Sequence, residues 1–445
     1  MHTWYEQAVF YHIYPLGLLG AEKTNTLTKT AHRLRDLETW IPHIRALNGS
    51  AIYIGPLFES SAHGYDTRDF RLVDRRLGTN EDFAHFVQLC HENGIRVVVD
   101  GVFNHTGREF FAFQDIREKR EASPYKDWYR GVNFGWGSPL GDPFGYEAWQ
   151  GHFELPCLNL WNPDVRQYLF DSIRFWVDNF DIDGIRLDCA NVLDFGFMKE
   201  LREKTSAMKP DFWLMGEVIH GEYNRWVNPE MLHSVTNYEL HKALYSGHND
   251  HNYFEIAHNV RRLEAVGRSL YTFVDNHDED RIASKLNNLA NLFPVYQLLF
   301  TLPGIPSVYY GSDWGIEGKR SRTSDEVLRP ALNLSDMLGK APELASHIAA
   351  LGKIHTENDA FHNGSYKELL LTNRQYAFSR SGEHGTVISA VNNDEQPASI
   401  SIPLPCAASD VVSLLPGEIP LSLENGRLSV TLPANGGAIF KLQEV

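Results

Sequence analysis

The sequence predicts an α/β protein: a (β/α)8 TIM barrel with a loop-rich domain inserted after its third strand and an antiparallel β-sandwich domain at the carboxyl terminus. Short apolar runs recur along the chain, as expected of parallel strands that are covered on both faces. Their spacing is close to the roughly thirty residues of one strand–helix unit. Eight such runs are present, which is the number that closes this barrel.

The eight strands are predicted at residues 9–14, 51–55, 95–100, 183–188, 212–217, 234–238, 270–275 and 305–310. Several of these runs end on, or lead directly into, a carboxylate. Glu217 lies 29 residues after Asp188, and Asp278 lies 61 residues after Glu217, which corresponds to one and then two units. Because the active site of such a barrel lies at the carboxyl ends of its strands, these carboxylates are predicted to share one mouth.

An insertion explains the long interval between the third and fourth strands. Asp188 lies 88 residues after Asp100, whereas one unit needs about thirty. Residues 105–160 are rich in Gly, Pro and aromatic residues, which predicts a loop-rich domain that overhangs the barrel mouth. The barrel is assigned to residues 1–104 and 161–358.

Helices are predicted between the strands where a capping residue precedes apolar residues at helical spacing. Thr79 and Asn162 begin two of them, and a last helical region is expected near residues 341–356. Beyond it, short alternating runs such as residues 385–392 are separated by turn residues. Residues 359–445 are therefore assigned to the antiparallel β-sandwich domain.

Composition limits the classes of function. The formal net charge of -16, from 41 basic and 57 acidic residues, argues against binding nucleic acid or an anionic membrane surface. The four cysteines lie far apart in the sequence, in no metal-binding spacing, which predicts reduced thiols. No signal peptide and no apolar run of membrane-spanning length is present, so a cytoplasmic location is expected.

Three carboxylates at one barrel mouth suggest glycoside hydrolysis. One acts as nucleophile, one as general acid and base, and a third stabilises the positive charge that develops on the sugar. Enzymes that use Mg²⁺ on barrels also place carboxylates at strand ends, so the residues around each carboxylate decide between these chemistries.

Four segments surround these carboxylates: Asp-Gly-Val-Phe-Asn-His at residues 100–105, Gly-Ile-Arg-Leu-Asp at 184–188, Gly-Glu-Val at 216–218, and Phe-Val-Asp-Asn-His-Asp at 273–278. In order and spacing they resemble the four sequence regions of the alpha-amylase family of glycoside hydrolases. Residues 155–159 resemble the fifth region of that family, and residues 304–311 resemble its eighth-strand motif. The resemblance extends from about residue 9 to residue 330.

The resemblance implies a role for each catalytic carboxylate. Asp188 matches the nucleophile that forms a covalent glycosyl intermediate, Glu217 the acid and base, and Asp278 the transition-state stabiliser. Arg186 stands two residues before Asp188 on the same face of its strand, where its charge favours the ionised form of that carboxylate.

Six further residues match substrate-binding positions of the family. His105 and His277 match histidines that bind sugar hydroxyls. The segment from His63 to Asp66 resembles the platform motif of the family, in which Tyr65 stacks on the sugar face and Asp66 contacts its hydroxyls. Arg329 resembles an arginine beyond the eighth strand that pairs with such an aspartate.

No cofactor is expected. Asn104 matches one calcium-site position of the family, but Asn191 and Val192 replace the Lys-His pair whose His carbonyl binds Ca²⁺ in secreted members. Residues 123–129, 188–191 and 216–220 look closest to the neopullulanase and cyclomaltodextrinase branch. Because the barrel begins within ten residues of Met1, the amino-terminal domain through which that branch dimerises is expected to be absent. Another mode of homo-oligomerisation stays open.

The predicted function is a retaining hydrolase of α-1,4 bonds in maltooligosaccharides or cyclodextrins. A first alternative is a 4-α-glucanotransferase or an α-1,6-acting relative, because Cys189 beside the nucleophile has no interpretation. A second alternative is a non-catalytic sugar-binding or partner subunit, as in the heavy chains of amino-acid transporters, although those proteins lack the acidic triad that stands here. The carboxyl groups of Asp188 and Glu217 are predicted to lie about 5 to 5.5 Å apart, as retention requires.

Overall fold

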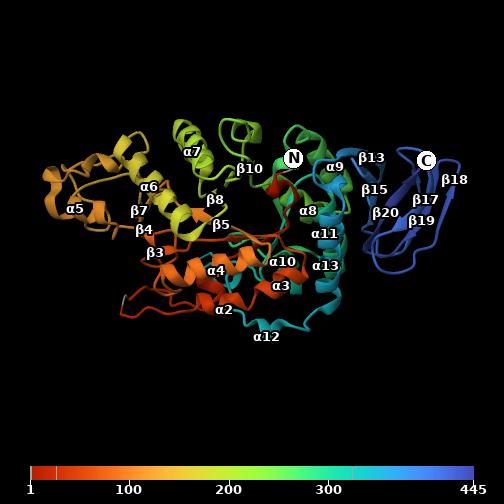
Figure 1. The fold of residues 1–445 in the computed structure, drawn as a ribbon, viewed down its shortest axis with the longest axis horizontal. Helices are drawn as coiled ribbons and strands as arrows, with labels where there is room; N and C mark the ends of the chain where they lie inside the picture. The colour runs from red at the N-terminus through yellow and green to blue at the C-terminus, as the bar shows by residue number, and fades with distance from the viewer. Residues whose placement is uncertain (1–2, 27, 323) are drawn as a thin grey trace.

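Eight parallel strands form a nearly closed barrel in the computed structural model, which describes residues 3–26, 28–322 and 324–445 (Figure 1). They are β1 (Phe10–Ile13), β2 (Ala51–Ile54), β5 (Arg96–Gly101), β8 (Gly184–Leu187), β9 (Trp213–Gly216), β10 (Ser234–Val235), β11 (Tyr271–Phe273) and β12 (Ile305–Tyr309). Each strand overlaps one of the eight predicted runs, so the barrel prediction is confirmed.

The order of the strands around the sheet is β10-β9-β8-β5-β2-β1-β12-β11. A parallel bridge between Thr236, just after β10, and Tyr271, at the start of β11, joins the two edges. The interior of the barrel is filled by side chains from many strands, among them Phe10, Tyr53 and Trp213. Because both faces of the sheet are covered, the strand residues are almost all buried, which explains why they read as apolar runs.

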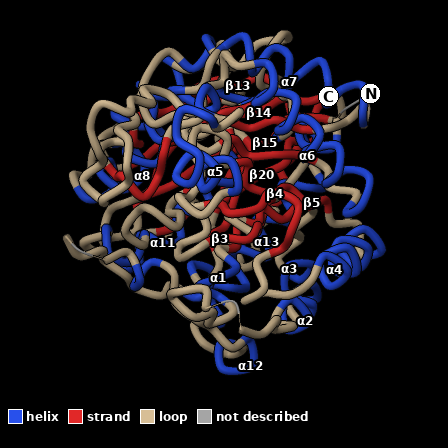
Figure 2. The backbone as a smooth tube through the Cα atoms, turned by 90° about the vertical axis from the view of Figure 1, so that its left-hand side faces the viewer, coloured by secondary structure: helices blue, strands red, loops and turns tan. Residues whose placement is uncertain are grey.

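Helices surround the strands, as Figure 2 shows. The helix predicted after Thr79 is α4 (Asn80–Glu92), and the Thr79 side chain accepts from the amide of Asp82. The others of the barrel are α1 (Pro15–Leu18), α2 (Leu34–Glu38), α3 (Ile41–Ala46), α6 (Pro163–Phe180), α7 (Phe195–Met208), α8 (Tyr238–Asn249), α9 (Tyr253–Arg262), α10 (Ile282–Lys285), α11 (Leu292–Thr301), α12 (Leu334–Met337) and α13 (Pro342–Glu357). No helix in the described part of the chain combines the length and the apolar character that crossing a membrane requires.

The segment between β5 and α6 projects from one end of the barrel in Figure 1. It contains α5 (Phe111–Lys119) and a short antiparallel pair, β6 (Ala148–Trp149) and β7 (His152–Pro156). Bridges from His105 to Cys157 and from Tyr129 to Leu158 bring its end back to its beginning. A second hairpin, β3 (Phe58–Ser60) and β4 (Thr67–Val73), follows β2 and was not predicted from the sequence.

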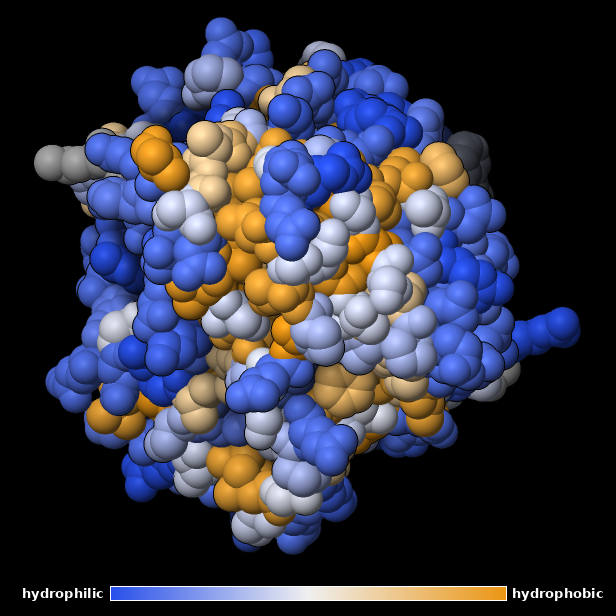
Figure 3. Space-filling view, turned by 90° about the vertical axis from the view of Figure 1, so that its right-hand side faces the viewer, coloured by the Kyte–Doolittle hydropathy of each residue, from blue (hydrophilic) through white to orange (hydrophobic). Residues whose placement is uncertain are grey.

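Two antiparallel sheets form the carboxyl-terminal region. One has the order β13 (Ser365–Leu371), β14 (Gln375–Gly382), β15 (Gly385–Asn392), β20 (Gly436–Glu444), β17 (Ala408–Ser413); the other is β16 (Ala398–Pro403), β19 (Arg427–Leu432), β18 (Leu421–Glu424). They share a separate apolar cluster that includes Ile388, Leu428 and Phe440. Apolar side chains also gather in the middle of the outer face seen in Figure 3. The domain boundaries given above stay predictions.

Candidate active site

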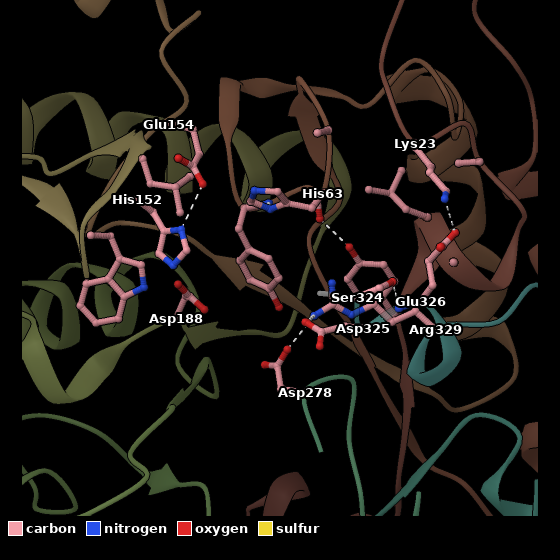
Figure 4. Close-up of a pocket in the computed structure, with 18 of the residues that line it drawn as sticks. Lys23, His63, His152, Glu154, Asp188, Asp278, Ser324, Asp325, Glu326 and Arg329 are labelled. Atoms are coloured by element: carbon pink, nitrogen blue, oxygen red, sulfur yellow. Dashed lines mark hydrogen bonds and ion pairs between the residues drawn. The ribbon is translucent and has the colours of Figure 1, made fainter. Parts of the chain in front are cut away.

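A cleft of about 860 Å³ opens at the carboxyl ends of the barrel strands (Figure 4). All three predicted catalytic carboxylates line it. Asp188 directly follows β8, Glu217 directly follows β9, and Asp278 lies in the loop after β11. Closure of the barrel therefore gathers side chains that are up to 90 positions apart in the sequence.

Arg186 binds three carboxylates in the interior of the site. Its Nη1 lies 2.9 Å from Asp100 Oδ1 and 2.7 Å from Asp188 Oδ1, and its Nη2 lies 3.0 Å from Glu217 Oε1. The guanidinium is almost completely buried. Burial alone would lower the pKa of Arg186, but Asp100 and Glu217 raise it well above its ordinary value. One permanent positive charge thus holds these carboxylates close together.

Glu217 occupies an environment that favours its protonated form. Burial, reinforced by the negative charge of Asp188, raises the pKa of Glu217 to about 7 in spite of the opposing charge of Arg186. Its Oε2 accepts a hydrogen bond of 3.0 Å from the amide of Cys189, and its Oε1 lies 3.5 Å from the Tyr238 hydroxyl. A carboxyl group that holds a proton near neutral pH is suited to act as a general acid.

Asp278 is held in the opposite charge state. It lies partly exposed, with Oδ2 3.0 Å from His277 Nε2 and Oδ1 2.7 Å from Arg329 Nη2. Burial alone would raise the pKa of Asp278, but the charges of His277 and Arg329 hold it well below its usual range. The side chain of Asn276 accepts from the amide of Asp278 and fixes the turn that carries it.

Arg329 has other partners than those expected from the sequence. It pairs with Asp278 and, at 3.5 Å, with Asp325, and its Nε donates to the carbonyl of His277. The expected partner, Asp66, is buried and accepts from the amide of Gly64 within its own turn. That turn places Asp66 behind the cleft wall, outside the residues that line the cleft.

Tyr65 and His63, from the loop between β3 and β4, do line the cleft. The Tyr65 hydroxyl donates to Asp100 Oδ2 at 3.1 Å and lies 2.5 Å from His277 Nε2. The rings of Tyr65 and His277 are stacked, with centroids 5.8 Å apart. These contacts place an aromatic surface between the buried carboxylates and Asp278.

His105 is one of the residues that line the cleft. Its Nδ1 lies 3.1 Å from Asn104 Nδ2, whereas Nε2 is buried without a hydrogen bond. Burial lowers the pKa of His105 to about 4, so the ring is neutral near pH 7. A buried polar atom that lacks a partner beside a cleft is suited to receive a ligand hydroxyl.

Cys189 is the cleft residue for which the sequence analysis had no interpretation. Its thiol lies 3.1 Å from Asp188 Oδ2. Among the described residues, Asp188, Cys189 and Glu217 form the one group of three His, Cys, Asp or Glu side chains whose ligand atoms lie within 4.8 Å of one another. Calcium prefers six to eight oxygen ligands, and this group offers a thiol and is already bound by Arg186, so it does not fit Ca²⁺.

Exposed charged residues that the sequence analysis missed lie at the two ends of the cleft. Figure 4 shows His152 with Glu154 on one side and Lys23 with Glu326 on the other. The ion pairs measure 3.1 Å and 2.7 Å. Exposed charged side chains are common on any protein surface, and no sequence signal separates these four residues from the others, so only the structure identifies them.

Comparisons with known proteins agree with this site. The catalytic-domain model of alpha amylase matches residues 25–343. The maltogenic alpha-amylase of Bacillus acidopullulyticus is 31% identical, and the cyclomaltodextrinase of Geobacillus thermopakistaniensis is 29% identical; each match covers 99% of this chain and 78% of the relative. The crystal structure of the debranching enzyme of Nostoc punctiforme has a TM-score of 0.85 at 27% identity, over 98% of both chains. The chain therefore belongs to the alpha-amylase family of glycoside hydrolases.

Proposed function

We propose that this enzyme is a retaining hydrolase that cleaves α-1,4-glucosidic bonds of maltooligosaccharides or cyclodextrins. The observation that supports it most strongly is the shared guanidinium of Arg186, which binds both Asp188 and Glu217. One oxygen of each carboxylate lies within 4.8 Å of the other. Retaining glycosidases need carboxyl groups about 5 to 5.5 Å apart, whereas inverting enzymes leave a wider gap for a water molecule.

In the first step, Glu217 donates its proton to the glycosidic oxygen, and the bond between that oxygen and C1 breaks. Asp188 forms a bond to C1 through a carboxylate oxygen, which gives a glycosyl ester. The raised pKa of Glu217, about 7, supports the acid role, because its burial keeps the proton in place until the leaving oxygen needs it. Arg186 Nη1 binds Asp188 Oδ1 at 2.7 Å and so restrains the carboxylate before the attack.

In the second step, Glu217 as a carboxylate takes a proton from water while the water oxygen attacks C1 and releases Asp188. A sugar hydroxyl can replace the water, which would transfer the glycosyl group to an acceptor. Asp278 stays ionised beside His277 and Arg329, and its negative charge stabilises the oxocarbenium-like transition states of both steps.

The proposed substrate contacts follow from the cleft walls. Tyr65 provides the stacking surface, and His63, His105 and Arg329 line the cleft around it with groups that can bind hydroxyls. His277 lies outside the residues that line the cleft; because its ring is stacked on Tyr65 and its Nε2 pairs with Asp278, it is proposed to position these two side chains. Asp66 is proposed to support the Tyr65 loop from behind, because its carboxylate is bound to Gly64. The substrate class is supported by the names of the maltogenic alpha-amylase and the cyclomaltodextrinase. The cytoplasmic location and the oligomeric state stay predictions.

A second candidate is cleavage of α-1,6 bonds. It is favoured by the similarity to the debranching enzyme, whose chain is matched over 98% of its length. Initial rates on maltotriose, panose and β-cyclodextrin separate the two: an α-1,4 hydrolase opens β-cyclodextrin and cleaves maltotriose faster than the α-1,6 bond of panose. The reverse order supports the second candidate.

The retaining mechanism is tested by proton NMR of the first product. We expect the newly formed reducing end to appear as the α-anomer before mutarotation, and Asp188→Asn to lose at least about 10³-fold in kcat. A β-anomer as the first product, or an Asp188→Asn variant with undiminished turnover, would contradict the proposal.

A further inference from the structure

Cys189 contacts both carboxylates that are proposed to perform the chemistry. Its thiol lies 3.1 Å from Asp188 Oδ2, and its amide donates to Glu217 Oε2 at 3.0 Å. The side chain is 8% exposed and lines the cleft. Arg186 binds the other oxygen of each carboxylate, Oδ1 of Asp188 and Oε1 of Glu217. Each carboxylate is therefore held at both of its oxygens.

The backbone conformation at this position allows the double contact. Cys189 adopts φ 50° and ψ 38°, in the left-handed region that residues other than Gly, Asn and Asp rarely occupy. The chain turns sharply there, between the end of β8 and the 3-10 helix Ala190–Val192. In this turn the amide points toward Glu217, just beyond the end of the neighbouring strand β9, while the side chain stays beside Asp188.

We propose that Cys189 is a positioning residue that sets the orientation of the nucleophile through its thiol and the orientation of the acid and base through its amide. This inference rests on the proposed roles of Asp188 and Glu217. It assigns a role to a residue that the sequence analysis could not interpret. The two contacts are chemically separate, because the thiol depends on the side chain and the amide depends on the backbone conformation.

A thiol suits this position because it remains a donor. Burial, together with the negative charges of Asp188 and Glu217, holds the pKa of the Cys189 thiol well above its ordinary value. A thiol that stays protonated donates to Asp188 Oδ2 whenever that carboxylate is ionised. It is also a poor nucleophile, since alkylation and oxidation proceed through the thiolate.

The thiol contact is tested with Cys189→Ala, Cys189→Gly and Cys189→Ser, each assayed on maltotriose and on α-maltosyl fluoride. Without the thiol, Asp188 Oδ2 loses its restraint and leaves the attack geometry more often. We expect Ala and Gly to lower kcat about tenfold on both substrates with KM nearly unchanged, and Ser to restore most of the rate. Gly adopts the left-handed conformation without strain, so the Cys189→Gly variant still tests the thiol contact if the Cys189→Ala variant does not fold.

The split between kcat and KM, together with rescue by serine, separates positioning from a merely structural role. A variant that only disturbed local packing would lose rate with Ser as well as with Ala and Gly, and KM would change with kcat. Arg186 on β8, Asp100 on β5, Glu217 after β9 and His105 after β5 also lie near Asp188, and none of them changes in these variants.

The amide contact is tested with Cys189→Val, because a β-branched residue avoids the left-handed region and turns the amide away from Glu217. Departure of fluoride needs little help from an acid, whereas the glycosidic oxygen needs a proton. We therefore expect this variant to lose several-fold more activity on maltotriose than on α-maltosyl fluoride. Cys90→Ala, at a fully buried cysteine of α4 far from the cleft, is the matched control for loss of a thiol.

Each outcome decides one claim. Wild-type kcat in both Ala and Gly, or a Ser variant as slow as Ala, would overturn the thiol contact. Equal losses on both substrates in Cys189→Val would overturn the amide contact. If Asp188→Asn keeps its turnover, the proposed function itself fails; if Asp188→Asn is inactive while all Cys189 variants behave as wild type, only the present inference fails.

Discussion

The barrel mouth and the junction between the barrel and the carboxyl-terminal sheets both bury polar groups, but they bury different kinds. At the mouth, three carboxylates share the one guanidinium of Arg186. At the junction, Gln297 of α11 donates to Ser389 Oγ and to the carbonyls of Ala390 and Ala438. Arg380 of β14 donates to the carbonyls of Thr301, Phe361 and Gly364.

The difference lies in what burial does to the charge states. At the mouth, burial and neighbouring charges move the pKa of Glu217 up to about 7 and hold that of Asp278 well below its usual range. At the junction, burial lowers the pKa of Arg380 to about 9, and its partners are backbone carbonyls that cannot titrate. The mouth is thus arranged for proton transfer, whereas the junction only joins two parts of the fold. Mutations at the two places should separate activity from stability.

The largest effect is expected for Arg186→Met compared with Arg380→Met, since both remove a buried guanidinium. Loss of one partner of a buried ion pair costs about 3 to 5 kcal/mol, which applies to Arg186. Loss of Arg380 leaves buried carbonyls without a donor, which costs about 1 to 3 kcal/mol, so both variants are expected to unfold more easily. Only Arg186→Met leaves Asp100, Asp188 and Glu217 without their common cation, and we expect it to lose more than about 10³-fold in kcat/KM.

Steady-state kinetics and chemical denaturation, both at a temperature where each variant is folded, check this pair. The proposed distinction between a catalytic mouth and a structural junction is wrong if folded Arg380→Met loses activity as severely as Arg186→Met, or if Arg186→Met keeps wild-type turnover.

The second largest effect is expected for Glu217→Gln, which should be more stable than the wild type above neutral pH. Because the folded pKa of Glu217 lies above the unfolded value, its favourable contribution is complete below about pH 4.5 and is lost as the pH rises through 7. Glu217→Gln cannot ionise and avoids that loss. We expect it to be as stable as the wild type near pH 4.5 and more stable by up to about 3 kcal/mol at pH 8, while kcat on maltotriose collapses.

Denaturant titrations at the two pH values measure this difference. Glu383→Gln, at an exposed glutamate of the carboxyl-terminal sheets, serves as a control that should show no such pH dependence. Equal stability of Glu217→Gln and wild type at pH 8 would mean that Glu217 is not kept protonated by its surroundings.

Much of the mouth could be predicted from the sequence because two of the three proposed catalytic carboxylates end an apolar run and the third, Asp278, follows one closely. Asp188 and Glu217 directly follow buried strands, and the carboxyl ends of all the strands of a closed barrel lie at the same mouth. The partners across the mouth could not be predicted this way. Arg329 pairs with Asp278, whereas the Asp66 carboxylate turns back and accepts from the amide of Gly64; no local sequence pattern predicts which aspartate Arg329 will bind.

The buried hydrogen bonds of the junction could not be predicted from the sequence. The strands around it could be predicted from alternation, as for β15 and β19. Gln297, however, lies in a strongly apolar helix where its contacts depend on the close approach of another strand. Gly437 makes that approach possible, since a Cβ at this position would lie 2.3 Å from Gln297 Oε1. Such contacts between distant segments follow from packing, which local propensity does not encode.

A smaller loss of activity is expected for Arg329→Gln. Asp278 then loses one of its two positive partners but keeps His277, so the depression of its pKa weakens without disappearing. We expect kcat/KM to fall about tenfold to hundredfold, and the acid-side limb of the pH profile to move to higher pH, because Asp278 gains a proton earlier as the pH falls.

The pH profile on maltotriose checks this result, and Arg320→Gln on the neighbouring loop is the matched control, since Arg320 reaches only the backbone carbonyl of Asp278. A fall in activity without any movement of the acid limb would show that Arg329 binds substrate and leaves the charge of Asp278 unaffected.

The smallest effect is expected at the junction, for Gln297→Met. Methionine has nearly the same shape as glutamine, so it keeps the packing against β15 and β20 while leaving Ser389 Oγ and two carbonyls without their donor. A lost set of buried hydrogen bonds of this kind costs about 1 to 2 kcal/mol. Hydrogen exchange should therefore become faster at the amides of β15 and β20, whereas kcat and KM on maltotriose stay at wild-type values, because no part of the junction reaches the cleft. If catalysis weakens together with the exchange protection, the carboxyl-terminal sheets support the mouth, and the division between a part that reacts and a part that only holds the fold together is wrong.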